Sequence, residues 1–118
     1  MRIPDHPTLI RRAIEARRKQ LAPKKPPFAA SLSQIRKNCG RPTCHCLQGG
    51  PLHTAFHLTY KVQGKTHTVY VPVDLLDEVR SWIEEHRRLK RLLREVQQLT
   101  LALVRTHVQE RRRRPKRS

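Results

Sequence analysis

All three cysteines of this chain fall within one eight-residue segment, Cys39-Gly-Arg-Pro-Thr-Cys44-His-Cys46. Thiolate and imidazole are the usual ligands of tetrahedral zinc, and the glycine and proline of this segment bend the backbone so that the thiols can converge. His53 is the first candidate for a fourth ligand, ahead of His57 and His45. The segment predicts a structural zinc site with the ligands Cys39, Cys44, Cys46 and His53.

Two other readings of the cysteines compete with metal binding. Isolated cysteines are most often small buried hydrophobic residues, but three within eight residues among turn formers disfavour that reading. A catalytic Cys-His pair would need a base, an oxyanion site and a pocket. A chain of 118 residues with 4% aromatics offers little from which to build them, and no paired acids, phosphate-binding glycine loop or Ser-His-Asp pattern is present. We therefore expect no enzymatic activity.

The charge balance indicates the class of partner. The chain has 26 Lys and Arg against 9 Asp and Glu, for a net charge of +17. Polyanions are the natural partners of such a surface. We expect neither a membrane span, since no apolar run reaches roughly 18–20 residues, nor a secretory signal. We expect the protein in a reducing cytoplasm, and at the nucleoid if it binds DNA. In a reducing compartment, clustered cysteines bind metal more often than they form disulfides.

The first third of the chain predicts a helix, a linker and a strand. Residues 7–21 have an amphipathic pattern with Pro7 in the first turn. Residues 22–27, Ala-Pro-Lys-Lys-Pro-Pro, cannot continue that helix. Residues 31–37 are a candidate third strand beside the hairpin described next.

A β-hairpin is the clearest local prediction. Strands 54–62 and 65–71 flank Gln63-Gly64, and Gly64 permits the positive φ of a two-residue turn. This turn would pair Tyr60 with His67, Leu58 with Val69 and Phe56 with Val71, which places them on one mainly apolar face. The other face would then carry His57, Thr59, Lys61, Thr66, Thr68 and Tyr70.

A long helix is predicted from residue 75 to about residue 110, with its first part covering the apolar face of the hairpin. Asp74 is the candidate N-cap. Apolar residues recur at seven-residue spacing from Leu75 to Leu103, and a second heptad position is partly apolar. This pattern favours a homodimer through residues 75–107. Leu92, Leu99 and Val104 widen the apolar side, which suits packing against residues 7–21 or against another chain. The basic segment 111–118 is expected to be disordered alone.

The sequence therefore predicts an α+β fold: an N-terminal helix, a zinc-knuckle-like loop, an antiparallel hairpin and a long C-terminal helix. We divide it into residues 1–30 (helix and linker), 31–110 (the main domain) and 111–118 (the tail).

The stretch from Leu32 to about Leu103 resembles the DUF6788-like family of small basic prokaryotic proteins. The resemblance is carried by the cysteine segment, by the hairpin ending in Tyr70-Val71-Pro72, and by Glu78-Val-Arg80-Ser-Trp82-Ile83. The family commonly has His-Gly-Pro-Tyr before the first strand of the hairpin, where this chain has His53-Thr-Ala-Phe56. The resemblance implies this fold, and its members are often encoded near transposases, which points to mobile DNA.

These observations favour a nucleic-acid-binding protein without catalysis, with DNA ahead of RNA, as an accessory or regulatory factor of a mobile element. The alternatives are a protein-interaction module that meets an acidic partner through the long helix, and a ribosome-associated protein. The polar hairpin face would either enter a groove or cover other protein, and the tail would add phosphate contacts. The candidate contact residues are Thr59, Lys61, Lys65, Thr66, Thr68, Arg36, Lys37, Arg41, Arg111, Arg112, Arg113 and Arg114.

Overall fold

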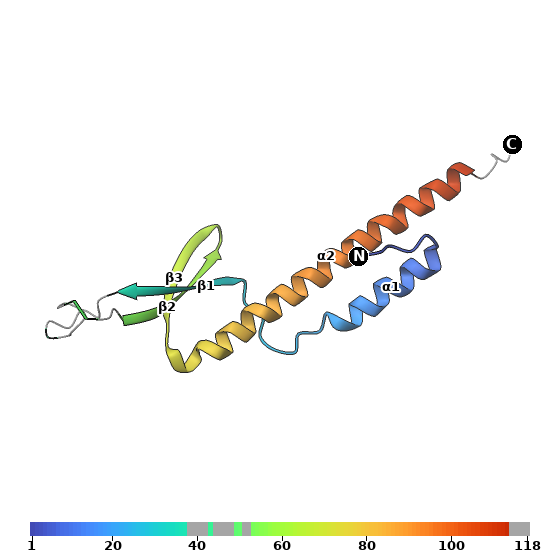
Figure 1. Cartoon of the computed structure of the whole chain (residues 1–118). Coiled ribbons are helices and arrows are strands. Elements are labelled where there is room, and N and C mark those ends of the chain that lie inside the picture. Colours follow the sequence, from blue (N-terminus) through green and yellow to red (C-terminus); the bar gives the residue numbers. More distant parts are fainter. Residues whose placement is uncertain (38–42, 44–48, 51–52, 114–118) are drawn as a thin grey trace. The chain divides into compact units, whose positions relative to one another are not determined.

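The computed structural model describes residues 1–37, 43, 49–50 and 53–113 of the 118-residue chain (Figure 1). These residues form two compact units, which are described separately. One unit, the sheet unit, comprises residues 25–86. The other, the helical unit, comprises residues 1–24 together with residues 87–118. Within the described ranges, neither helix combines the length and the apolar composition needed to cross a membrane.

The sheet unit is built on three antiparallel strands in the order β1-β2-β3 (Figure 1). The strands are β1 (Ala30–Lys37), β2 (His53–Val62) and β3 (Lys65–Val71). Strand β1 pairs with β2 so that Leu32 lies opposite Leu58. The third strand suggested by residues 31–37 is thus present, and the predicted α+β fold class is confirmed.

The hairpin between β2 and β3 has the predicted register. Leu58 pairs with Val69, Phe56 with Val71 and Tyr60 with His67. Both turn residues have positive φ, with Gln63 at 51° and Gly64 at 80°. This is the conformation of a turn whose twist matches that of its flanking strands, so the turn and the alternation of the strands specify the same pairing.

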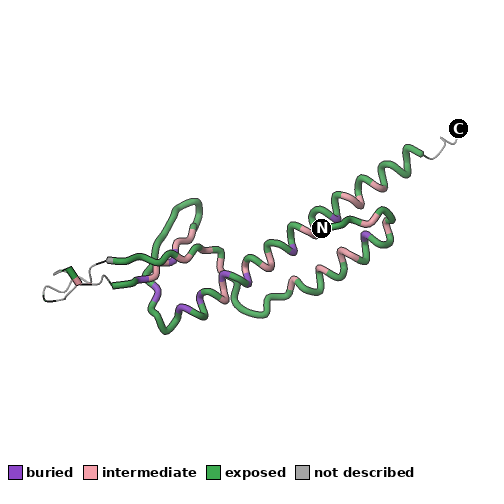
Figure 2. Tube along the Cα trace, in the orientation of Figure 1, coloured by how far each residue is buried: buried purple, intermediate pink, exposed green. Residues whose placement is uncertain are grey.

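The core of the sheet unit joins one face of the sheet to the start of helix α2 (Leu76–Arg113). It consists of Leu58 and Val71 from the sheet and Leu76, Val79 and Ile83 from the helix (Figure 2). Trp82 is half-buried against this cluster, together with Phe28, Ala30, Leu32 and Phe56. The predicted covering of the apolar hairpin face by the long helix is therefore confirmed.

The proline-rich linker before β1 is attached to α2 by its backbone. The Phe28 N–H donates to the Trp82 carbonyl at 3.0 Å, and the Lys25 N–H donates to Glu85 Oε2 at 3.4 Å. Glu85 is buried, so its carboxylate needs such donors. These bonds order a segment that has no regular structure of its own.

The helical unit pairs α1 (Pro7–Gln20) with the later part of α2 (Figure 1). Helix α1 starts at the predicted residue, with Pro7 in its first turn and His6 Nδ1 accepting from the Thr8 N–H at 3.2 Å. Ile10 of α1 and Leu99 of α2 have no exposed surface. The guanidinium of Arg88 donates to the carbonyls of Gln20 and Ala22 at 2.7 and 3.2 Å, which satisfies acceptors at the end of α1.

Helix α2 is preceded by a single 3₁₀ turn, η2 (Val73–Leu75). Pro72, not Asp74, is the N-cap of that turn, and no side chain caps it. The prediction that Asp74 is the N-cap is therefore wrong, because the 3₁₀ turn starts the helical segment two residues earlier, at Val73. Asp74 lies in the first turn instead, where a negative charge is favourable.

Candidate nucleic-acid interface

Acidic residues are absent from a long part of the sequence that includes the whole sheet. No Asp or Glu occurs between Glu15 and Asp74. All acids of the sheet unit belong to η2 and the first turns of α2: Asp74, Asp77, Glu78, Glu84 and Glu85. The three strands therefore present only neutral and cationic groups to a partner.

The distal part of the β2–β3 hairpin, residues 59–70, is here called the hairpin arm. Every residue of β3 except Val71 is exposed, including Val69 at 46% and Tyr70 at 59%. Val69 and Tyr70 point to opposite faces of the strand, so the described residues leave both faces of the arm open. Beyond Tyr60, the last residue of β2 that pairs with β1, the arm is a two-stranded ribbon. A ribbon of this kind is thin enough to enter the major groove of B-DNA, which is roughly 12 Å wide.

One face of the hairpin arm carries hydroxyl groups and one lysine. Lys61 pairs with Thr66, and Thr59 pairs with Thr68. Directly paired residues of neighbouring strands share a face, so these four side chains gather as the sequence predicted. Lys61, Thr66 and Thr68 are exposed and Thr59 is half-buried.

The opposite face of the arm carries a row of rings. Phe28 meets Tyr60 edge to face, with 5.7 Å between the ring centroids, and Tyr60 stacks on His67 at 5.5 Å. Such ring pairs add about 0.5–1.5 kcal/mol beyond buried area. They tie the arm to the linker before β1 and hold it in a defined shape.

The other predicted contacts on the sheet are more scattered. Lys65 pairs with Val62, one position along from Lys61 and Thr66, so it belongs to the face of the ring row. Arg36 is exposed near the end of β1. Lys37 is the last residue of β1 and pairs with His53, and Arg41 lies outside the described residues. The hydroxyl-bearing face and these cations therefore form no single cluster.

Most of the positive charge belongs to the helical unit. Its sequence has nineteen Lys and Arg against four acids, Asp5, Glu15, Glu95 and Glu110. The sheet unit has seven Lys and Arg against five acids. The helical unit therefore has nearly all of the chain's net charge of +17.

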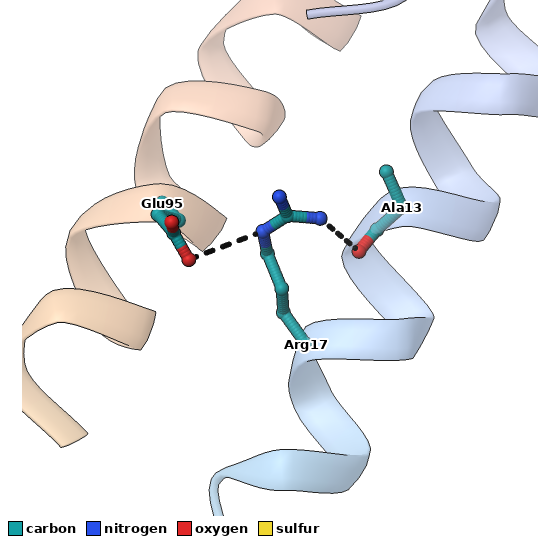
Figure 3. A network of polar contacts seen from close by, with 3 residues as sticks. All are labelled: Ala13, Arg17 and Glu95. Carbon is teal, nitrogen blue, oxygen red and sulfur yellow. Dashed lines mark hydrogen bonds and ion pairs between the residues drawn. The ribbon is translucent and has the colours of Figure 1, made fainter. Parts of the chain in front are cut away.

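Two acids of the helical unit form ion pairs with arginines. Glu95 Oε2 accepts from Arg17 Nε at 3.3 Å, and the same guanidinium donates to the Ala13 carbonyl at 3.2 Å (Figure 3). Glu15 Oε2 accepts from Arg18 at 2.8 Å. Among the described residues of the helical unit, eleven exposed cations have no acidic partner: Arg2, Arg11, Arg12, Lys19, Lys90, Arg91, Arg94, Arg105, Arg111, Arg112 and Arg113.

The last arginines belong to a helix over part of the predicted tail. Arg111, Arg112 and Arg113 form the last turn of α2 and are exposed, while Arg114 lies outside the described residues. Cations are favourable at a helix C-terminus because the carbonyl dipoles point there. The end of α2 therefore has a fixed group of charges.

The predicted metal ligands are only partly within the described residues. Cys39, Cys44, Cys46 and His45 lie outside them. His53 begins β2 and is exposed. His57 is half-buried on the polar face of the sheet, and its buried Nε2 has no hydrogen-bond partner. Among the described residues, no group of three or more His, Cys, Asp or Glu is placed to hold a metal ion.

Our sequence reasoning did not anticipate how unevenly the two units are charged. Part of this uneven charge could be read from the sequence, because no Asp or Glu lies in the residues that form the sheet. The rest depends on α1 packing beside the later part of α2, which makes one surface of two basic segments far apart in the sequence.

Comparison with known proteins gives one match. No curated protein and no solved structure matches the chain. The model of a domain of unknown function, DUF6788, matches residues 10–81. That range covers more than half of the chain and runs from within α1, through the whole sheet, to the start of α2. The chain therefore belongs to the DUF6788 family.

Proposed function

We propose that this protein binds nucleic acid without catalysing a reaction, and that duplex DNA is its preferred form. The observation that carries the proposal is the set of exposed Lys and Arg side chains of the helical unit that have no acidic partner among the described residues. Positive charge at this density repels itself, and phosphates neutralise it with a gain from released counterions. This term supplies affinity with little dependence on sequence.

The hairpin arm supports DNA over RNA. A ribbon fits the major groove of B-DNA, whereas the major groove of A-form RNA is deep, narrow and closed to side chains. Hydroxyl side chains such as Thr66 and Thr68 can contact base edges or phosphates, and Lys61 adds a positive charge beside them. In this proposal the arm provides groove contacts and the helical unit provides most of the phosphate contacts.

The zinc hypothesis remains part of the proposal. Three thiols and one imidazole are a suitable donor set for a structural zinc ion. Cys39, Cys44 and Cys46 follow β1, and the fourth ligand is His53, His57 or His45. The unsatisfied Nε2 of His57 favours examining that residue alongside His53. A bound ion would order the connection between β1 and β2.

The test is the salt dependence of binding to a fluorescently labelled duplex, followed by anisotropy between roughly 50 and 200 mM salt. Each phosphate contact contributes about 0.9 to the slope of log K against log salt for B-DNA. Replacing Lys90, Arg91 and Arg94 with glutamine should therefore lower the slope by up to about 2.7. A matched control replaces Gln97, Gln98 and Gln109, which are exposed and uncharged on the same helix, with alanine.

The expected result is steep salt dependence for the native chain and the control, and a reduced slope for the glutamine variant. An RNA duplex of the same sequence should bind less tightly at each salt concentration. Binding that does not depend on salt, or no binding to any duplex at low salt, would discard the proposal. A slope unchanged in the glutamine variant would remove these three residues from the interface.

A further inference from the structure

Helix α2 exposes a line of large apolar side chains in the helical unit. Leu93, Leu101, Val104 and Val108 are 57%, 49%, 56% and 42% exposed. Their separations of eight, three and four residues bring them to one side of a helix with 3.6 residues per turn. We call these four residues the apolar stripe.

Helix α1 packs on a different side of α2. Leu92 and Leu99 are the buried residues of α2 in this unit, and Glu95 is bound to Arg17 of α1. Residues 92, 95 and 99 follow the three- and four-residue spacing of one helix side. The apolar stripe is offset from that side, so α1 leaves it uncovered.

A hollow of about 380 Å³ lies along the C-terminal part of the stripe. Pro7 and Arg11 of α1 form one wall, and Leu103, Val104 and Val108 of α2 form the other. The hollow is therefore a groove between the two helices, in which Arg11, His107 and Glu110 accompany these apolar side chains. An amphipathic helix docks in grooves of this kind through side chains spaced three or four residues apart.

The charge around the stripe defines the occupant. Arg94 and Arg105 lie seven and four residues from Leu101, and Lys90 lies four residues before Arg94, so all three are on the side of Leu101; all three are exposed. The acids of α2 in this unit are Glu95, which is paired with Arg17, and Glu110, which lines the end of the hollow. The rim of the stripe is therefore cationic.

A second copy of the chain fits this rim poorly. A symmetric dimer brings the same patch of each subunit together. Cations at the rim would then face cations or neutral residues over most of its length, because the acids near the stripe, Asp5 and Glu110, lie at its C-terminal end. Like charges across an interface oppose association. A partner with apolar side chains flanked by Asp and Glu satisfies both the stripe and its rim.

We propose that the apolar stripe of α2 is a docking site for an acidic amphipathic helix of another protein. The rim shares Lys90 and Arg94 with the proposed phosphate contacts, but the docking site itself consists of exposed apolar side chains, which contribute nothing to phosphate binding. The stripe, residues 93–108, also lies outside the matched family segment, residues 10–81.

The probe is a labelled helical peptide of about 21 residues, which is three heptads, with leucine at the two core positions and glutamate at the flanking ones. One control peptide replaces its glutamates with lysines. A second keeps the composition but scrambles the order, which removes the apolar side. The protein variant is Leu101→Ser with Val104→Ser, and its matched control is Gln98→Ser with Gln109→Ser, at exposed positions off the stripe. Circular dichroism checks that both variants keep their helix content.

Anisotropy should show saturable binding of the acidic peptide, weakened at least tenfold in the Leu101/Val104 variant and unchanged in the Gln98/Gln109 control. Equal binding of the scrambled peptide would show charge attraction alone and would overturn the proposal. So would a failure of the acidic peptide to bind. Sedimentation equilibrium gives the remaining outcome: a dimer that the Leu101/Val104 variant dissociates would assign the stripe to a second copy. Duplex binding by that variant is measured in parallel, so that loss of either activity is seen separately.

Discussion

The turn of the hairpin offers a sharp test of how this sheet is specified. Gly64 has φ of 80°, and a Cβ added there would meet no atom within 4 Å. The cost of Gly64→Ala is therefore one of backbone conformation alone, without a steric clash. A left-handed conformation costs an L-residue about 1–2 kcal/mol. We expect Gly64→Ala to lower the free energy of unfolding of the sheet unit by that amount.

The neighbouring residue should respond in the opposite direction. Gln63 already has φ of 51°, and asparagine tolerates positive φ better than glutamine does. Asn-Gly is also the preferred sequence for this turn. Gln63→Asn should therefore stabilise the unit by a few tenths of a kcal/mol, about the size of other small turn effects.

Trp82 makes the measurement specific to the sheet unit. It is the only tryptophan of the chain and is half-buried against the core of that unit. Urea unfolding followed by its fluorescence should show a midpoint lowered by roughly 0.3–2 M in Gly64→Ala, given slopes of about 1–3 kcal/mol per molar. Lys65→Ala is the control, because its strand conformation suits alanine. An unchanged midpoint in Gly64→Ala, or a lower one in Gln63→Asn, would refute the assigned turn.

Three further outcomes test the two cores and the metal. Leu58→Ala, at a position only 4% exposed, should destabilise the sheet unit by about 2–5 kcal/mol, and a loss under 1 kcal/mol by Trp82 fluorescence would contradict the assigned core. Ile10→Ala should detach α1 and raise amide hydrogen exchange in residues 7–20, with Leu9→Ala as an exposed control; equal exchange in both would show that Ile10 is not the anchor. Elemental analysis of untagged protein should find one zinc per chain, lost in a Cys44→Ser variant, and metal-free protein with an intact sheet would end the zinc hypothesis.

The hairpin could be predicted to the level of individual pairs for a physical reason. Its register is fixed twice, by the alternation of Phe56, Leu58 and Tyr60 and by the turn at Gln63-Gly64, and both give the same pairing. The start of α2 was less well determined, because Asp74 is a good N-cap by residue type but Pro72 begins a 3₁₀ turn before it. Local rules do not distinguish these two starts.

The helical unit could not be derived in the same way. The heptad residues Leu89, Val96 and Leu103 predict a partner for α2 without saying which one. In the structure these residues are half-buried, in the unit that α2 forms with α1. Periodicity could not distinguish the exposed apolar stripe from the side of α2 that packs on α1. A heptad pattern describes one apolar side of a helix, and α2 has two.

The unequal charge of the two units makes the salt slope a measure of which unit binds DNA. If the hairpin arm alone binds, its two lysines, Lys61 and Lys65, allow about two phosphate contacts and a slope near −2. If the helical unit binds through its eleven exposed unpaired cations, the slope can approach about −10. Both units in contact would give the steep slope, and Lys61→Gln would then reduce it by about 0.9. A shallow slope that Lys61→Gln reduces by about half would instead place binding on the arm, and the charge of the helical unit would then need a different polyanion to explain it.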